Sequence, residues 1–345
     1  MATANEAYCM RRAIEIAENG LGTTSPNPLV GAVILGADGR FVGEGFHERA
    51  GGPHAEVNAI AHAGEDARGG TMIVTLEPCA HHGRTGPCVD AIVAAGIVRV
   101  VYAVDDPTPQ AGGGAAALRA AGIDVESGVL TREAEEGNEV WLHAVRTGRP
   151  FVFWKYASTL DGRVAAPDGT SRWISGERAR AEVHLLRHRV DAVVVGTGTA
   201  LADDPELTVR DEDGVRADRQ PLRVVVGTRE LPADAKLNDT SVADTVRLAG
   251  DPAAVLAELF DRGVRSVLLE GGPTLAGAFV RAGLVDEIHA YLAPTLLGGG
   301  AQALIADVTT LSDGVRLLVR DISRVGTDIK VVARPAPVAT ESEGR

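Results

Sequence analysis

The chain has 345 residues, a net charge of −13 and 45% hydrophobic residues. Its length predicts two domains of ordinary size. The negative charge argues against nucleic acid as a partner, because phosphates must be met by a basic surface, but a few local arginines can still hold a small phosphorylated substrate. No apolar run is long enough to span a membrane and no signal peptide is evident, so we expect a cytoplasmic protein. The three cysteines do not suggest a disulfide framework.

The first half alternates predicted helices and strands, which is the pattern of a three-layer α/β domain. We expect helices over residues 6–19, 55–63, 88–95, 115–121 and 131–146. We expect strands over residues 30–35, 71–76, 99–104 and 123–129.

The segment 147–150 is the predicted linker, because Pro150 disfavours helix in the residue before it. The predicted domains are therefore 1–146 and 151–334, and the polar residues 335–345 are expected to form a disordered tail. In the second half we expect strands over 151–156, 192–196, 222–226, 266–269 and 287–292, and more strands between 315 and 333. Helices are expected over 177–189, 253–262 and 274–282.

His54, Cys79 and Cys88 have the residue types of a catalytic zinc site. Three protein ligands leave the fourth tetrahedral position for water, whose pKa zinc lowers from ~16 toward ~7. Glu56 is the expected catalytic group, moving the proton of that water to a leaving nitrogen. Because His54 and Glu56 are two residues apart, we expect His54 in the first turn of a helix that Pro53 begins. The alternative is a buried histidine beside two inert core cysteines.

Three further residues of this half, Asn27, His81 and His82, are candidate substrate contacts. Asn27 is stiffened by the prolines on both sides; a rigid Asn suits recognition of a base edge, and turn formation would explain it equally well. His81 and His82 could complete a structural zinc site or could instead touch substrate.

Two glycine-bearing turns follow predicted strands of the second half, Gly196-Thr197-Gly198-Thr199 and Glu270-Gly271-Gly272-Pro273. Only the second is expected to open a helix, whose free N–H groups can bind phosphate. Neither turn is G-x-G-x-x-G, and each, taken alone, is more often a plain strand-to-helix connection than a cofactor loop.

The whole pattern resembles bacterial bifunctional riboflavin-biosynthesis enzymes of the RibD type. The first-half matches are residues 26–31, 54–59 and 75–85 with 87–88, including the eight residues between the two cysteines; the second-half matches are 155–163, 171–175, 201–210 and 270–275. The resemblance implies a cytidine-deaminase-like domain followed by a dihydrofolate-reductase-like domain. It also implies Zn²⁺ and NADPH as cofactors, and we expect a homo-oligomer.

The resemblance assigns contacts in the reductase half by position. Cofactor contacts carry over to Ala157, Trp173, Thr199, Asp203, Thr228, Gly272, Pro273, Thr274, Leu275, Ala276, Gly277 and Ala278. Substrate contacts carry over to Ser171, Arg187, Leu207, Arg210 and Glu270, and Lys155 and Asp203 are expected to handle polar contacts or protons at the reducing site. Without the resemblance, we would interpret Lys155 as a surface lysine and Asp203 as a helix-capping aspartate.

The implied chemistry has two steps. Zinc hydroxide deaminates 2,5-diamino-6-(5-phosphoribosylamino)pyrimidin-4(3H)-one at C2, and NADPH then reduces the ribosyl group to a ribityl group. Thr108 stands where members of the family often have Asn, which weakens the expectation of a substrate contact there.

Three other functions fit parts of the pattern. A deaminase acting on polynucleotides would need a basic face and stacking aromatic residues, which a net charge of −13 and 4% aromatic residues do not support. A zinc-stabilised binding module would unfold without metal but would not need Glu56. One half could also be inactive, although no motif is missing from either.

Overall fold

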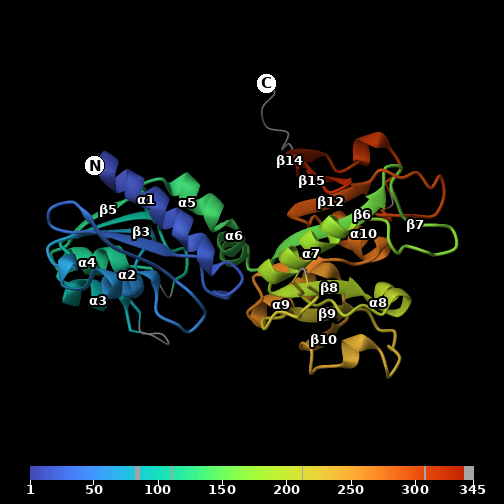
Figure 1. Cartoon of the computed structure of the whole chain (residues 1–345), viewed down its shortest axis with the longest axis horizontal. Helices are drawn as coiled ribbons and strands as arrows, with labels where there is room; N and C mark the ends of the chain where they lie inside the picture. The colour runs from blue at the N-terminus through green and yellow to red at the C-terminus, as the bar shows by residue number, and fades with distance from the viewer. Residues whose placement is uncertain (82–85, 110–111, 212, 307, 338–345) are drawn as a thin grey trace. The chain divides into compact units, whose positions relative to one another are not determined.

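The computed structural model describes residues 1–81, 86–109, 112–211, 213–306 and 308–337. It divides into two compact units, Met1–Gly148 and Arg149–Arg345, which are described separately (Figure 1). In the described part of the chain, no helix combines the length and the apolar composition that a bilayer crossing requires.

The first unit contains a five-stranded sheet in the order β2-β1-β3-β4-β5. Its strands are β1 (Gly31–Leu35), β2 (Phe41–Phe46), β3 (Thr71–Leu76), β4 (Arg99–Val104) and β5 (Asp124–Ser127). Strand β1 pairs antiparallel with β2 and β3, whereas β3, β4 and β5 run parallel. The central strands β1 and β3 are almost wholly buried, as expected for a sheet covered on both faces.

Helices cover both faces of this sheet, with α1 and α5 on one side and α2, α3 and α4 on the other (Figure 1). The helices are α1 (Ala4–Ala17), α2 (Ala55–Ala63), α3 (Cys88–Ala95), α4 (Gly114–Ala120), α5 (Thr131–Gly137) and α6 (Glu139–Thr147), with 3₁₀ turns η1 (Glu18–Gly20) and η2 (Gly64–Ala67). Helix α1 begins earlier than expected because Thr3 and Glu6 form a capping box. The expected three-layer arrangement is thus present.

Two local expectations for this unit were wrong, and one strand was missed. The expected helix 131–146 is divided at Asn138, whose side chain accepts a hydrogen bond from the Leu29 N–H at 3.1 Å, so a tertiary contact outweighs helix continuity. Pro53 does not begin α2, because His54 is the N-cap residue in an extended conformation. Strand β2 was not expected; its glycines let helix α2 pack closely, since a Cβ on Gly45 would lie 2.4 Å from the Ala59 nitrogen.

The second unit contains an eight-stranded sheet in the order β10-β9-β8-β11-β6-β12-β15-β14 and a small sheet of β13 with β7. The six strands from β10 to β12 in this order are parallel to one another. Strand β15 runs antiparallel to both of its neighbours, β12 and β14. The strands are β6 (Phe151–Thr159), β7 (Arg163–Ala165), β8 (Ala192–Gly196), β9 (Leu222–Val226), β10 (Thr245–Leu248), β11 (Ser266–Leu269), β12 (Glu287–Ala293), β13 (Ala301–Gln302), β14 (Leu317–Val325) and β15 (Asp328–Pro335).

Alternation along the strands builds a core on each face of this sheet. Val194 joins one apolar cluster, whereas its neighbours Val193 and Val195 join another. The helices are α7 (Glu177–Arg189), α8 (Thr197–Asp203), α9 (Pro252–Asp261) and α10 (Pro273–Arg281), with 3₁₀ turns η3 (Lys236–Asn238) and η4 (Leu311–Asp313). Helix α8 and strands β7, β10 and β13 were not expected from the sequence.

The structure also moves two expected boundaries. Thr147 belongs to α6, so the connection between the units is shorter than 147–150, and Gly148 ends the helix in a left-handed conformation. Strand β15 includes Pro335, and the Ala336 N–H donates to the Arg316 carbonyl at 2.8 Å, so the expected tail does not begin at residue 335. Residues 338–345 of that tail lie outside the described residues.

Candidate functional site

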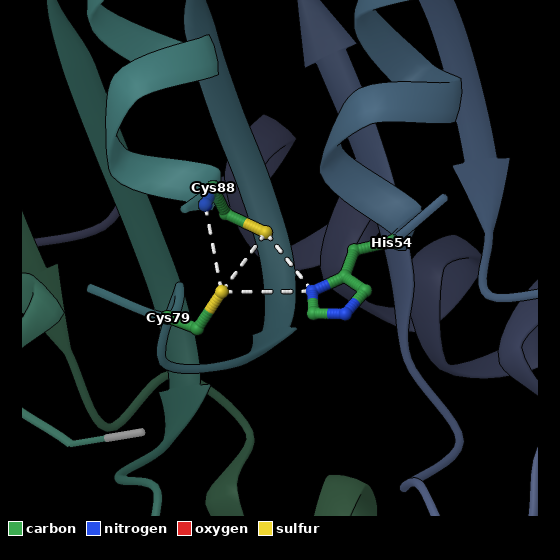
Figure 2. A group of neighbouring side chains, drawn as sticks. All are labelled: His54, Cys79 and Cys88. Atoms are coloured by element: carbon green, nitrogen blue, oxygen red, sulfur yellow. Dashed lines mark hydrogen bonds between the residues drawn. The ribbon is translucent and has the colours of Figure 1, made fainter. Parts of the chain in front are cut away.

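Three side chains from separate elements meet in the first unit (Figure 2). His54 is the N-cap of α2, Cys79 lies in the loop after β3, and Cys88 is the first residue of α3. His54 Nδ1 lies 3.2 Å from Cys88 Sγ and 3.6 Å from Cys79 Sγ, and the two sulfurs are 3.5 Å apart. Residues up to 34 positions apart in the sequence thus form a single compact cluster.

The cluster fits a tetrahedral zinc ion. Zinc-to-ligand distances of ~2.3 Å for sulfur and ~2.0 Å for nitrogen place tetrahedral ligand atoms roughly 3.5–3.8 Å apart, close to the separations observed. His54, Cys79 and Cys88 form the only group of at least three potential ligands within mutual reach in the described ranges. Three ligands leave one tetrahedral position for water, which is the arrangement of a catalytic site.

The two thiols influence each other strongly. The pKa of Cys79 is lowered, chiefly by its interaction with Cys88 and further by His54, whereas that of Cys88 is raised by Cys79 and by burial. One sulfur of the pair therefore ionises at the expense of the other. A bound cation is the group that allows both to be thiolates.

Glu56 lies beside this cluster, in the first turn of α2. Its side chain is 3% exposed, and burial raises the pKa of its carboxyl group. The carboxyl group interacts with the Cys88 thiol. A buried carboxyl group of raised pKa next to a metal site can take and return a proton.

Asn27 is oriented by His47, a residue that the sequence analysis did not single out. The Asn27 amide nitrogen lies 3.0 Å from His47 Nε2, and His47 Nδ1 lies 2.9 Å from the Pro53 carbonyl. Because a carbonyl only accepts, Nδ1 carries the proton and Nε2 accepts from Asn27. The Asn27 N–H also bonds the Thr24 carbonyl at 2.9 Å, so the turn interpretation holds together with an oriented side chain.

The loop that carries Cys79 is held by Glu77. Its carboxylate accepts from the Ala115 N–H at 2.9 Å and from the Asp106 N–H at 3.3 Å. The start of α4 also approaches this loop closely, since a Cβ on Gly114 would lie 1.7 Å from the Pro78 carbonyl oxygen. His81 follows in the same loop, is exposed, and is not one of the clustered ligands; His82 lies outside the described residues.

In the second unit, the candidate reductase residues gather at the carboxyl ends of parallel strands. From β8 the chain continues to β9 and β10, which lie on one side of β8. It then returns to β11, which lies on the other side of β8, so β8 and β11 mark the point where the strand order reverses. Ligands of open α/β sheets bind at such points. The expected turn after β8 proves to be the start of α8, and it meets the turn after β11 there, because a Cβ on Gly272 would lie 2.9 Å from Thr199 Oγ1.

The turn after β11 fits the phosphates of a dinucleotide. Gly272 is the N-cap of α10 and no side chain caps that helix. The backbone N–H groups of its first turn are thus available to an anion. Ala276 is fully buried and Gly277 abuts the Ile305 carbonyl, where a Cβ would come within 1.8 Å, so these two expected contacts face protein.

The charged candidates form one buried group. Arg187 Nε and Nη2 lie 2.6 and 3.0 Å from the two oxygens of Glu270. Burial lowers the pKa of Lys155 on β6, and Glu270 opposes that shift. Arg187 also holds Glu270 ionised, against the effect of its burial. The residues expected separately as substrate contacts therefore form an ion pair with an amine nearby.

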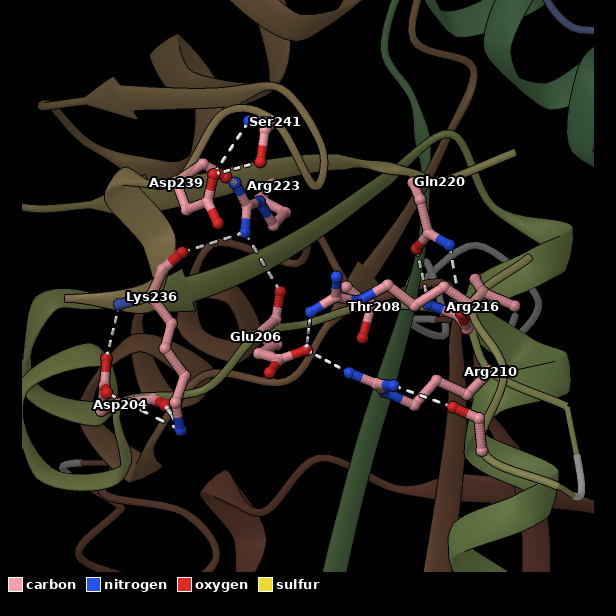
Figure 3. A network of polar contacts seen from close by, with 12 residues as sticks. Asp204, Glu206, Thr208, Arg210, Arg216, Gln220, Arg223, Lys236, Asp239 and Ser241 are labelled. Atoms are coloured by element: carbon pink, nitrogen blue, oxygen red, sulfur yellow. Dashed lines mark hydrogen bonds and ion pairs between the residues drawn. The ribbon is translucent and has the colours of Figure 1, made fainter. Parts of the chain in front are cut away.

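A polar network shapes the segment from Asp204 to Arg210 (Figure 3). Glu206 pairs with both Arg210 and Arg216, the latter at 3.1 Å. The Gln220 side chain bonds the backbone of Val209 at 2.7 and 3.1 Å. The fully buried Arg223 donates to the carbonyls of Glu206, Lys236, Asp239 and Ala243.

The remaining candidates are placed as follows. Leu207 is buried with φ 54°, Thr228 is exposed just beyond β9, and Ala157 on β6 is paired with Tyr291 on β12. Trp173 is 69% exposed and stacks under Arg180, with 4.5 Å from the guanidinium carbon to the ring centre. Ser171 and Trp173 lie in the same turn, and Arg172 donates to the Asp203 carbonyl.

Sequence reasoning missed several residues of these two sites. His47, Gln220 and Arg223 act through contacts with segments far away in the chain, and nothing in their local sequence signals this. Glu77 could have been noticed, because a buried acid directly after an apolar strand needs partners.

Two family models match the chain. The cytidine and deoxycytidylate deaminase zinc-binding region matches residues 3–104, and the RibD C-terminal domain matches residues 150–331. Riboflavin biosynthesis protein RibD of Mycobacterium tuberculosis is 51% identical over 330 residues, covering 94% of this chain and 96% of that protein. The chain belongs to the RibD family.

Solved RibD structures agree with the fold described above. RibD of Acinetobacter baumannii superposes with a TM-score of 0.88 at 41% identity, covering 96% of this chain and 99% of that one. A Thermotoga maritima protein, described as a diaminohydroxyphosphoribosylaminopyrimidine deaminase/5-amino-6-(5-phosphoribosylamino)uracil reductase, has a TM-score of 0.87 at 36% identity, covering 96% and 99%. RibD membership confirms the expected fold class and a riboflavin-biosynthesis enzyme that joins a zinc deaminase to an NADPH-dependent reductase.

Proposed function

We propose that the first unit deaminates 2,5-diamino-6-(5-phosphoribosylamino)pyrimidin-4(3H)-one and that the second unit then reduces the ribosyl group of the product to a ribityl group. The observation that carries this proposal is the meeting of His54, Cys79 and Cys88 beside Glu56. The activities printed for the Thermotoga maritima protein support it.

In the deaminase unit, His54, Cys79 and Cys88 would hold zinc, which when bound would lower the pKa of a water molecule toward neutrality. Glu56 would accept a proton from the water that adds to C2 and would deliver it to the leaving amino nitrogen, so that water is consumed and ammonia is released. The raised pKa of Glu56 favours its holding the proton between these two transfers. Asn27, oriented by His47, is the proposed contact to the pyrimidine edge.

In the reductase unit, bound NADPH would supply the hydride for C1 of the open-chain ribosyl imine. Lys155 gives a proton to the imine nitrogen, a transfer that its lowered pKa favours. The ion pair with Arg187 keeps Glu270 charged beside that amine. Arg210 is the proposed contact to the substrate phosphate. The phosphate must compete with the Glu206 carboxylate for the Arg210 guanidinium group.

Mass spectrometry tests both halves at once. Zinc-loaded protein is incubated with the diaminopyrimidine ribosyl phosphate, with and without NADPH. We expect replacement of an amino group by oxygen in both samples and a gain of two hydrogens only with NADPH. Absence of both changes with zinc bound would contradict the proposed substrate, and the first change alone would contradict the reductase assignment.

We also propose that the chain forms a homo-oligomer through β14. This strand lies at the edge of the eight-stranded sheet. It exposes apolar side chains on both of its faces, with Leu317 44%, Leu318 50%, Val319 57% and Ile322 66% exposed. Edge strands of this kind pair readily with another chain. Light scattering after size exclusion should show that Ile322→Glu lowers the molar mass, and an unchanged mass would contradict this surface.

A cytoplasmic location and the absence of a nucleic-acid partner complete the proposal. The three thiols are unpaired, and two of them belong to the zinc cluster, which suits a reducing compartment. The net charge of −13 supports a small substrate in preference to a polynucleotide. A gel shift at physiological salt checks the second statement, and a bound polynucleotide would contradict it.

A further inference from the structure

The first residues of α8, which follow β8 directly, lie beside the turn after β9. The two strands are parallel neighbours, with Gly196 opposite Val226 at their carboxyl ends. The next residues, Thr197 and Gly227, are therefore in contact. A Cβ on Gly227 would lie 2.7 Å from Thr197 Oγ1, and Gly227 has φ 130°, a conformation that suits glycine.

This contact brings the side chain of Arg229 over the first turn of α8. Arg229 Nε lies 3.4 Å from Thr197 Oγ1, and its Nη2 lies 3.1 Å from the position that a Cβ of Gly198 would occupy. A side chain at residue 198 would thus crowd the guanidinium group. Arg229 and Gly198 are both exposed.

The charge of Arg229 is not neutralised within the described parts of the chain, where no carboxylate lies within ion-pair distance of it. The contrast with its neighbours is clear, because Arg247 pairs with Glu230 at 2.8 Å and Arg210 pairs with Glu206. An exposed guanidinium group above Gly198 in the first turn of α8, beside the Thr197 hydroxyl, is suited to an anion.

The order of the strands indicates which part of the cofactor reaches Arg229. The reacting groups lie on one side of the reversal point, with Lys155 on β6 and Glu270 directly after β11. The proposed phosphate turn at Gly272 follows β11, and β8 and β9 lie beyond it on the other side. With the nicotinamide toward Lys155, the adenosine end of a dinucleotide must extend over the first turn of α8 and the turn after β9.

We propose that Arg229 binds the 2′-phosphate of NADPH and thereby makes the reductase prefer NADPH to NADH. The inference rests on the proposed reductase function. NADH has a hydroxyl group where NADPH has a phosphate, so a guanidinium group at this place discriminates between them. Thr228, the adjacent expected cofactor contact, is exposed in the same turn.

Binding of cofactor fragments tests the inference without any turnover. Calorimetry compares 2′,5′-ADP with 5′-AMP, which lacks the 2′-phosphate. We expect Arg229→Gln to weaken 2′,5′-ADP binding about 10- to 100-fold, the range for hydrogen bonds to charged groups, and to leave 5′-AMP binding unchanged. Arg229→Lys should restore part of the loss, since it keeps the charge but not the planar fork.

Arg262→Gln is the control, because Arg262 is an exposed arginine on the C-cap of α9 that pairs with Glu258. It removes the same charge and should leave both affinities unchanged. If Arg229→Gln kept the wild-type preference for 2′,5′-ADP over 5′-AMP, the inference about Arg229 would be overturned, but the proposed reductase function would not. Failure of the wild-type protein to bind NADPH at all would overturn the proposed cofactor use and this inference with it.

Discussion

Arg187 on α7 and Glu270 after β11 form a two-pronged ion pair, with side chains that are only 15% and 11% exposed. Both were expected from the sequence as substrate contacts, and the structure shows that each is the counter-charge of the other. Arg187 Nη1 also donates to the Thr208 carbonyl at 3.0 Å, which ties the pair to the segment carrying Leu207 and Arg210. The ion pair is therefore structural as well as part of the site.

Removing one partner of this pair should be costly. We expect Glu270→Ala to lower the free energy of unfolding of the second unit by about 3–5 kcal/mol, because it leaves a buried guanidinium unpaired. The double variant Arg187→Met/Glu270→Leu should lose less than either single variant. Urea unfolding measures both, and Glu258→Ala in the exposed Arg262–Glu258 pair is the control, with a loss of about 0–1 kcal/mol. Equal losses at the two sites would contradict the prediction.

Asp161 should make the second unit sensitive to acid. Its carboxylate accepts from Thr159 Oγ1 and from the Gly298 N–H, both at 2.6 Å, and these bonds lower its pKa from 3.8 to about 2. A carboxyl group whose pKa is lower in the folded state stabilises that state above pH 3.8, and this contribution disappears as the pH falls toward 2.

The matching variant is Asp161→Asn, which removes the titrating group. Urea unfolding at several pH values between 5 and 2.5 should show that the variant loses less stability than the wild type as the pH falls. The difference between the two proteins should be largest at pH 5. Parallel pH profiles would show that Asp161 does not hold the loop at Leu297 and Gly298.

Periodicity and motif spacing predicted much of this molecule. The apolar runs of β3, β4, β8 and β11 are unambiguous, and the residue types of His54, Cys79 and Cys88 indicated zinc before any geometry was known. Two departures from expectation come from contact between distant segments. Asn138 breaks a helix to bond Leu29, and the pairing of Arg187 with Glu270 joins residues 83 apart. Local sequence carries no record of such partners.

Glu56→Gln should separate zinc binding from deamination. The amide cannot take the proton of the attacking water, so we expect deamination to fall about 10²- to 10⁴-fold. Zinc content, measured by elemental mass spectrometry, should stay the same, because Glu56 is not one of the ligands. Reduction of separately deaminated substrate should also be unchanged. Asp90→Asn, at an exposed position in the first turn of α3, is the control. Loss of zinc from Glu56→Gln would show that Glu56 serves the metal site in another way.

Gly114 should prove necessary for the position of Cys79. A Cβ at residue 114 would lie 1.7 Å from the Pro78 carbonyl oxygen, which is a backbone atom and cannot swing aside as a side chain can. We expect Gly114→Ala to cost about 1–3 kcal/mol of stability through overpacking. Because the displaced carbonyl directly precedes Cys79, zinc affinity measured by competition with a chelator should fall as well.

The control for this variant is Gly137→Ala in α5. A Cβ there would meet only Ile14 Cγ2, at an ordinary 3.6 Å. Replacing a helical glycine without strain should change stability by no more than about 1 kcal/mol, in the stabilising direction, and should leave zinc affinity unchanged. If Gly114→Ala lowered stability but not zinc affinity, the contact with Pro78 would serve the packing of α4 and not the metal site. If both variants behaved alike, the close approach at Gly114 would have no bearing on Cys79.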